Sequence, residues 1–129
     1  MSTQRPKSIT DRIKTIQDAI NELGEPDVEV AELRKLENAT ITSHILYRQQ
    51  AVVITKALNE DWVPDFSNLE QTKYEPWFEY DSSADGFLRY NYLGRGTSTD
   101  VGSRLCFKSR ELAEYFGKQF IEIHRKYLK

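Results

Sequence analysis

The residues that could ligate a metal or act as nucleophiles are few in this sequence, and they lie far apart. His44 and His124 each lack a carboxylate or thiol three or four residues away, so neither fits a helical zinc motif. Cys106 is the single cysteine, which excludes an internal disulfide and a cysteine-built zinc site. Gly94-x-Gly96 lacks the other residues of a dinucleotide or P-loop motif. We therefore predict no metal, no cofactor and no catalytic residue, and thus a protein that is not an enzyme.

Aromatic and basic residues offer a different chemistry, which is nucleic-acid binding. Trp77, Tyr90 and Tyr92 fall on predicted strands, where their rings could stack on unpaired bases. Basic side chains nearby could contact phosphates, so the predicted site also includes Arg89, Arg104, Lys108, Arg110 and Lys118. The alternative is that aromatic residues favour strands in any case and fill cross-strand pairs.

Charges are divided unevenly along the chain, although the formal net charge is only −2. Residues 1–59 carry 8 basic and 8 acidic side chains, whereas residues 60–85 carry 8 acidic ones and only Lys73 as a base. Residues 86–129 carry 9 basic and 4 acidic side chains. Two interpretations stay open: the basic segment forms a surface for phosphates, or the acidic and basic segments neutralise one another across adjacent strands.

The spacing of apolar residues predicts three helices that would position these groups. A helix over residues 8–23 has apolar side chains at intervals of three and four residues and ends at Gly24. Residues 27–37 are ambiguous between a short helix and a connection. A helix over residues 37–59 is apolar on two sides, which predicts that it lies between the first helix and a sheet. Ser109 caps a last helix, whose apolar positions run to Tyr127.

Strands are predicted over residues 73–80, 87–93 and 101–107, and their short connections favour an antiparallel meander. The predicted class is α+β, with N-terminal helices, a three-stranded antiparallel sheet and a C-terminal helix packed on the sheet. We expect a single domain over residues 1–129, in which residues 1–7 are a flexible tail. Pro76 indicates an edge strand, which leaves room for pairing between copies, and the oligomeric state stays open.

The sequence also carries no signal for a membrane or for secretion. No apolar run approaches the roughly 20 residues that a membrane span needs. The first residues are polar and lack the apolar region of a signal peptide. We therefore expect a soluble, cytoplasmic protein that does not contact a membrane.

Several motifs in the second half of the chain resemble one known family. The first are Ala57-Leu58-Asn59-Glu60-x-Trp62-x-Pro64-Asp65, Lys73-Tyr74-x-Pro76-Trp77-Phe78 and Gly86-Phe87. The longest is VGSRLCFKSxELAxYxGKQF, which runs from Val101 to Phe120. These motifs are similar to a family of small uncharacterised proteins encoded by Bacteroidetes genomes and their phages. The departures are Asp61, where the family pattern has Gly, and His124-Arg125, where it has Leu-Tyr.

The resemblance implies a phage or mobile-element origin and assigns no catalytic residue. Two functions remain. The first is a non-enzymatic accessory protein that binds single-stranded or structured nucleic acid through a basic and aromatic sheet face, in the host cytoplasm if the protein is phage-encoded. The alternative is a protein–protein module, such as a phage-encoded inhibitor or adaptor of a host defence complex, whose contact surface is acidic segment 60–85 or an exposed aromatic patch.

Overall fold

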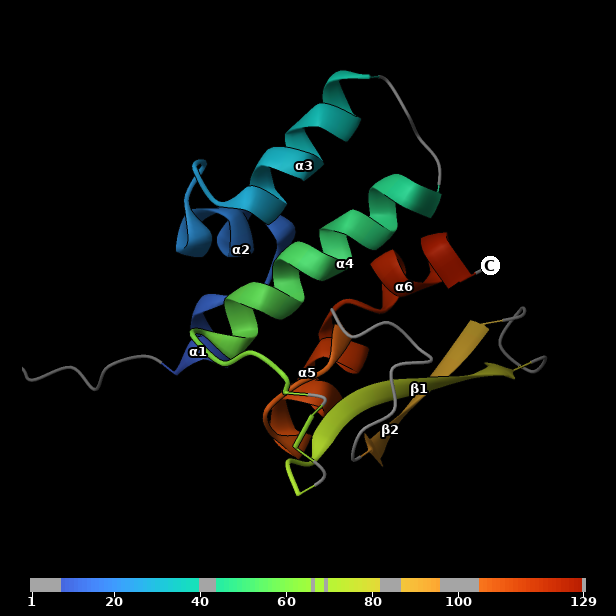
Figure 1. Cartoon of the computed structure of the whole chain (residues 1–129). Helices are drawn as coiled ribbons and strands as arrows, with labels where there is room; N and C mark the ends of the chain where they lie inside the picture. The colour runs from blue at the N-terminus through green and yellow to red at the C-terminus, as the bar shows by residue number, and fades with distance from the viewer. Residues whose placement is uncertain are drawn as a thin grey trace, which may run out of the picture.

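The computed structural model describes residues 8–39, 44–65, 67–68, 70–81, 87–95 and 105–128, with backbone alone for 75–81, 87–95 and 127–128. Its described helices are α1 (Ile9–Arg12), α2 (Ile16–Leu23), α3 (Val28–Asn38), α4 (His44–Asn59), α5 (Arg110–Gln119) and α6 (Ile121–Leu128). Its strands are β1 (Lys73–Asp81) and β2 (Phe87–Arg95), as Figure 1 shows. The described chain is mostly helical, and the predicted α+β class with a three-stranded antiparallel sheet is wrong.

The single helix predicted over residues 8–23 is two helices, because a second capping box lies inside the apolar pattern. The Thr15 hydroxyl accepts a hydrogen bond from the Asp18 amide at 3.1 Å, and the Asp18 carboxylate accepts from the Lys14 and Thr15 amides. In a continuous helix these amides would bond to carbonyls of the preceding turn. Here side chains of the capping box accept their hydrogen bonds instead, so a new helix, α2, begins at Ile16. Ile13 lies in the break and is still buried, which explains why the apolar spacing ran through it.

Contacts from the C-terminal half also hold this break in place. The Tyr115 hydroxyl on α5 donates a hydrogen bond to the carbonyl of Ile13. The Gln119 side chain donates to the carbonyl of Lys14 at 3.1 Å. These carbonyls have no helical partner at a break, so the bonds from α5 satisfy them and attach the N-terminal helices to α5.

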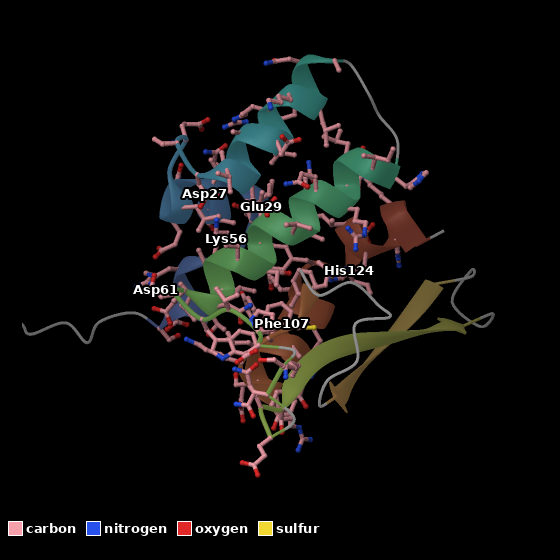
Figure 2. All side chains as sticks on the ribbon, viewed as in Figure 1. Asp27, Glu29, Lys56, Asp61, Phe107 and His124 are labelled. Carbon is pink, nitrogen blue, oxygen red and sulfur yellow. The ribbon has the colours of Figure 1, made fainter. Side chains whose placement is uncertain are left out.

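The ambiguous segment 27–37 forms α3, which is attached to α4 by polar contacts at its N-terminus. Asp27 caps α3 and forms an ion pair of 2.8 Å with Lys56 on α4. Burial acts to raise the pKa of Asp27, but hydrogen bonds from Lys56 and the Glu29 amide outweigh it and lower that pKa. The Gln49 amide donates to the carbonyl and the carboxylate of Glu29, and Figure 2 shows Asp27, Glu29 and Lys56 between the two helices.

The helix α4 is central, but both of its neighbouring layers are helical. α2 and α3 pack on one side and α6, with a smaller contribution from α5, on the other (Figure 1). Its buried side chains include Ala51, Val53, Ile54, Ala57 and Leu58. The prediction of a sheet against this helix is wrong: an apolar stripe shows that a neighbour exists but not which element supplies it.

The strands β1 and β2 form a two-stranded antiparallel ribbon, and α5 lies against both of them. Lys73 is opposite Arg95, and the pairing continues without a bulge to Asp81 opposite Phe87. Of the third strand predicted over residues 101–107, residues 105–107 contribute only an isolated bridge between Phe107 and Tyr74, and residues 101–104 lie outside the described residues.

The predicted last helix is likewise divided, into α5 and α6, which meet at Phe120. At this point the His124 ring donates from Nε2 to the carbonyl of Phe116 at 2.8 Å, and the Phe120 amide reaches the same carbonyl at 3.3 Å. A side chain that competes for a helix carbonyl weakens the regular bond and favours such a division. Within the described ranges, none of the helices is long and apolar enough to span a bilayer.

The capping box predicts the effect of one substitution. Thr15→Ala removes the acceptor for the Asp18 amide, and we expect the free energy of unfolding to fall by about 1 kcal/mol. Urea unfolding followed by circular dichroism measures this change. Thr72→Ala, at an exposed position between α4 and β1, is the control and should change stability by less than about 0.5 kcal/mol. Equal effects of the two substitutions would contradict the capping role.

Candidate functional site

The strand register separates the aromatic residues predicted to stack on bases. Residues directly opposite in an antiparallel pair share a face of the ribbon. Trp77 is opposite Asn91, whereas Tyr90 and Tyr92 are opposite Phe78 and Pro76. By alternation Arg89 shares the face of Trp77, and the two tyrosines lie on the other face. The backbone register therefore places the predicted stacking residues on two faces of the ribbon.

The basic residues predicted to contact phosphates lie beside carboxylates of the same chain. Lys108 Nζ is 3.3 Å from a carboxylate oxygen of Glu60, and Arg110 Nε is 2.9 Å from one of Glu114. In the ribbon, Arg89 is opposite Glu79. Lys118 is exposed on α5, and Arg104 lies outside the described residues. The charges of Lys108 and Arg110 are thus balanced within the chain.

Residues 105–109, which belong to the long motif that runs from Val101 to Phe120, form a junction between three elements. The Asn59 side chain, at the end of α4, donates to the carbonyl of Cys106 at 2.8 Å and accepts from the Lys108 amide at 3.1 Å. Between these two residues, Phe107 exchanges two backbone hydrogen bonds with Tyr74 at the start of β1. Phe107 is fully buried and lies between the strands and the helices in Figure 2. These motif residues therefore have a structural role.

Ser109 completes the junction by capping α5, since its hydroxyl accepts from the Leu112 amide at 3.3 Å. On the other side, Glu60 follows α4 with a φ of 59°, in the left-handed region that glycine adopts more readily. Its carboxylate lies between Lys108 at 3.3 Å and Arg12 at 4.0 Å. The two ion pairs link α1 to the junction.

A buried lysine anchors the segment that connects α4 to β1. The side chain of Lys73 is 1% exposed, and its ammonium group donates to the carbonyls of Asn68 and Gln71 at 3.1 and 2.9 Å. The Gln71 side chain accepts from the Asp65 amide at 2.6 Å, which ties the middle of the segment to its end. We call residues 60–72 the acidic loop. Its described part is ordered by these bonds and not by a regular element.

The described part of the acidic loop carries exposed carboxylates and one exposed apolar side chain. Asp61, Asp65 and Glu70 are exposed, and Val63 is 74% exposed (Asp61 is labelled in Figure 2). Hydrogen bonds from the hydroxyl and the amide of Ser67 lower the pKa of Asp65, so this group stays charged at neutral pH. Among the described residues, no cation forms an ion pair with Asp61 or Glu70. This is the candidate site: an acidic segment that also exposes a valine.

The residues considered first for chemistry have structural surroundings. No three histidine, cysteine, aspartate or glutamate residues lie close enough to hold a metal within the part of the chain that the structure describes. His44 is exposed at the start of α4, and Cys106 is buried beside Phe107. His124 is buried with its ring edge-on to Phe116, and this burial lowers its pKa to about 4.

Sequence reasoning missed Lys73 and Asn59 as the residues that organise the site. Both are buried polar side chains, and a hydropathy pattern places such residues on the surface. The only signal was their position in the short motifs around residues 57–60 and 73–74, which does not reveal what they bind.

The anchoring role of Lys73 is open to direct test. Lys73→Met keeps the apolar stem but leaves the carbonyls of Asn68 and Gln71 without the ammonium donor. We expect a loss of about 1–3 kcal/mol in unfolding free energy, together with faster hydrogen exchange across the acidic loop. Lys118→Met, at an exposed position of α5, is the matched control and should alter neither measurement. Unchanged exchange in the Lys73 variant would show that the loop is held in another way.

The low pKa of His124 predicts acid-sensitive stability. The folded state binds the proton less readily, because the pKa of His124 is about 4 there against 6.5 for an exposed histidine, so stability is complete above pH 6.5 and falls towards pH 4. The contribution is on the order of 3 kcal/mol. We expect His124→Leu to remove this part of the pH dependence in unfolding curves, whereas His44→Gln keeps it. Parallel pH curves for the wild type and His124→Leu would be the contrary result.

Comparison of the chain with protein-family models, with curated proteins and with solved structures found no match. The resemblance to proteins of Bacteroidetes and their phages therefore stays a prediction, and the geometry of the described residues carries the functional argument.

Proposed function

We propose that this chain is a non-enzymatic protein-binding module whose contact surface is the acidic loop. One observation carries the proposal: Lys108 and Arg110 lie in ion pairs with the chain's own carboxylates, whereas no cation in the described ranges forms an ion pair with the exposed Asp61 or Glu70. A surface of this kind attracts a basic partner. The same surface repels the phosphates of a nucleic acid.

The loop has the features that favour a specific contact. Burying Val63, which is exposed in the loop, would contribute about 1.5–3 kcal/mol, and the carboxylates of the loop would orient a partner with lysine or arginine at its rim. The bonds from Lys73 hold the loop in shape before any partner arrives, which lowers the entropy lost on binding. The partner that fits is a protein segment with apolar residues flanked by basic ones.

The resemblance to phage-encoded proteins favours a more particular role for such a module. A small non-enzymatic module that binds a basic surface fits an inhibitor or adaptor of a host complex, acting in the host cytoplasm. Nucleic-acid binding through Trp77, Arg89, Tyr90, Tyr92, Arg104, Lys108, Arg110 and Lys118 is the competing proposal. It needs cations that leave their carboxylate partners and aromatic residues from both faces of the ribbon.

A peptide selection tests the proposal without knowledge of the natural partner. The full chain is immobilised and random peptides are selected from a display library. We expect enriched peptides to combine lysine or arginine with apolar residues, because they must complement both the carboxylates and Val63. Binding of the synthetic peptides is then measured by fluorescence polarisation.

Charge reversal in the loop supplies the control. The double variant Asp61→Lys with Glu70→Lys should lose at least tenfold in affinity, a change of about 1.4 kcal/mol. Glu32→Lys with Glu122→Lys makes the same change in net charge at exposed sites of α3 and α6 and should bind as the wild type does. Peptides that bind both double variants equally would refute the loop as the contact surface.

A second measurement addresses the competing function. Labelled single-stranded DNA and RNA are titrated with the chain at about 50 mM salt, where phosphate contacts are strongest. We expect no binding. Affinity that falls steeply with added salt and is lost in Lys108→Ala with Arg110→Ala would favour nucleic-acid binding instead.

A further inference from the structure

The bridge between Tyr74 and Phe107 determines which way the main-chain groups of the ribbon point. The Tyr74 amide donates to Phe107 at 3.0 Å, and the Tyr74 carbonyl accepts from Phe107 at 2.6 Å. Both groups of Tyr74 therefore point away from β2. Because this direction alternates along a strand, the outward residues of β1 are Tyr74, Pro76, Phe78 and Tyr80. The register then makes Leu88, Tyr90, Tyr92 and Gly94 the outward residues of β2.

The two edges of the ribbon differ in their capacity to pair with another strand. On β1, the groups of Tyr74 are taken by Phe107, and Pro76 has no amide hydrogen to donate. The edge of β2 contains no proline, and none of the described residues pairs with it. An edge with consecutive outward donors and acceptors is a template for strand addition. The competent edge is that of β2, not the edge near Pro76.

We propose that β2 pairs with β2 of a second copy of this chain, antiparallel and about a two-fold axis at Asn91. The pairing joins two ribbons into one four-stranded sheet in the order β1-β2-β2-β1. This proposal concerns a surface other than the acidic loop and does not depend on it.

The sequence of β2 is self-complementary in this register. The outward residues form the hydrogen-bonded pairs, so that Tyr90 of one copy is opposite Tyr92 of the other and Leu88 is opposite Gly94. On the alternate positions, Arg89 is opposite Leu93, Phe87 is opposite Arg95, and Asn91 meets its own copy. No two like charges are opposed, although the strand carries two arginines and no acidic residue.

The corresponding pairing of β1 with itself lacks this complementarity. In the two registers that bring its central residues together, Glu75 is opposite either Glu79 or Asp81 of the other copy. Like charges directly opposite destabilise a strand pair, and Pro76 removes a donor in both registers. Charge and hydrogen bonding therefore select the same edge.

A cross-linking experiment on the full chain tests both the edge and the register. In the proposed dimer the two copies of Asn91 form a non-hydrogen-bonded pair, whose short Cα separation of about 4.5 Å suits a disulfide. Asn91→Cys should form a covalent dimer under mild oxidation and revert on reduction. Cys106 is buried, so the introduced thiol is the reactive one.

Trp77→Cys is the matched control, because residue 77 is directly opposite residue 91 on the same face of the ribbon. It should stay monomeric on a non-reducing gel. Cross-linking of Trp77→Cys instead of Asn91→Cys would assign the interface to β1, and cross-linking of both or of neither would overturn the proposal as well.

Sedimentation of the unaltered chain gives an independent readout that does not depend on the cysteine variants. We expect a dimer that dissociates on dilution, and a monomer at every concentration would overturn the proposal. Tyr90→Pro removes an outward donor of β2 without breaking a bond to β1 and should shift the chain to monomer. Phe78→Pro makes the equivalent change on the β1 edge and should leave the dimer intact.

Discussion

The buried side chain of Asn59 is the constraint on which the rest of the arrangement depends. Its amide group binds the backbone on both sides of Phe107, at Cys106 and Lys108, which are 47 and 49 positions from Asn59. Phe107 in turn pairs with Tyr74, so the end of α4, the start of β1 and the approach to α5 are set by one side chain. A buried amide of this kind is stable only when its donor and its acceptor are both used, which makes the junction an all-or-none unit.

Several charged side chains of this molecule form ion pairs that connect its elements. Glu60 takes up the positive charge of Lys108 at the junction, and Asp27 takes up that of Lys56 between α3 and α4. The charge that a surface presents is therefore not the sum of the sequence charges. It comes from the side chains that form no ion pair, and among the described residues of the acidic loop these side chains are negative. A near-neutral chain can thus present a surface of one sign, which a net charge of −2 does not reveal.

The sequence predicted the positions of helices better than their limits and neighbours. Regular apolar spacing located α2, α4 and α5, and Ser109 was correctly expected to cap a helix. The apolar spacing did not reveal the break before α2, because Ile13 is buried whether or not the backbone is helical there. The predictions of a sheet beside α4 and of a third strand were wrong for the same reason. An apolar pattern shows that a segment is buried, but which element it packs against depends on the whole fold. The burial of Lys73 was not predicted, because charged residues are expected at the surface.

The hydrogen bonds from Tyr115 and Gln119 to the break before α2 have a consequence for how the chain is made. They join residues 102 and 105 positions apart, nearly the full span of the described chain. During synthesis, α1 and α2 leave the ribosome long before α5 exists, and the carbonyls that α5 will cover face water until then. α2 and α3 can pack on α4 as soon as these helices have emerged, but the carbonyls at the break before α2 are covered only when α5 arrives. Closure of this break is therefore a late event in folding.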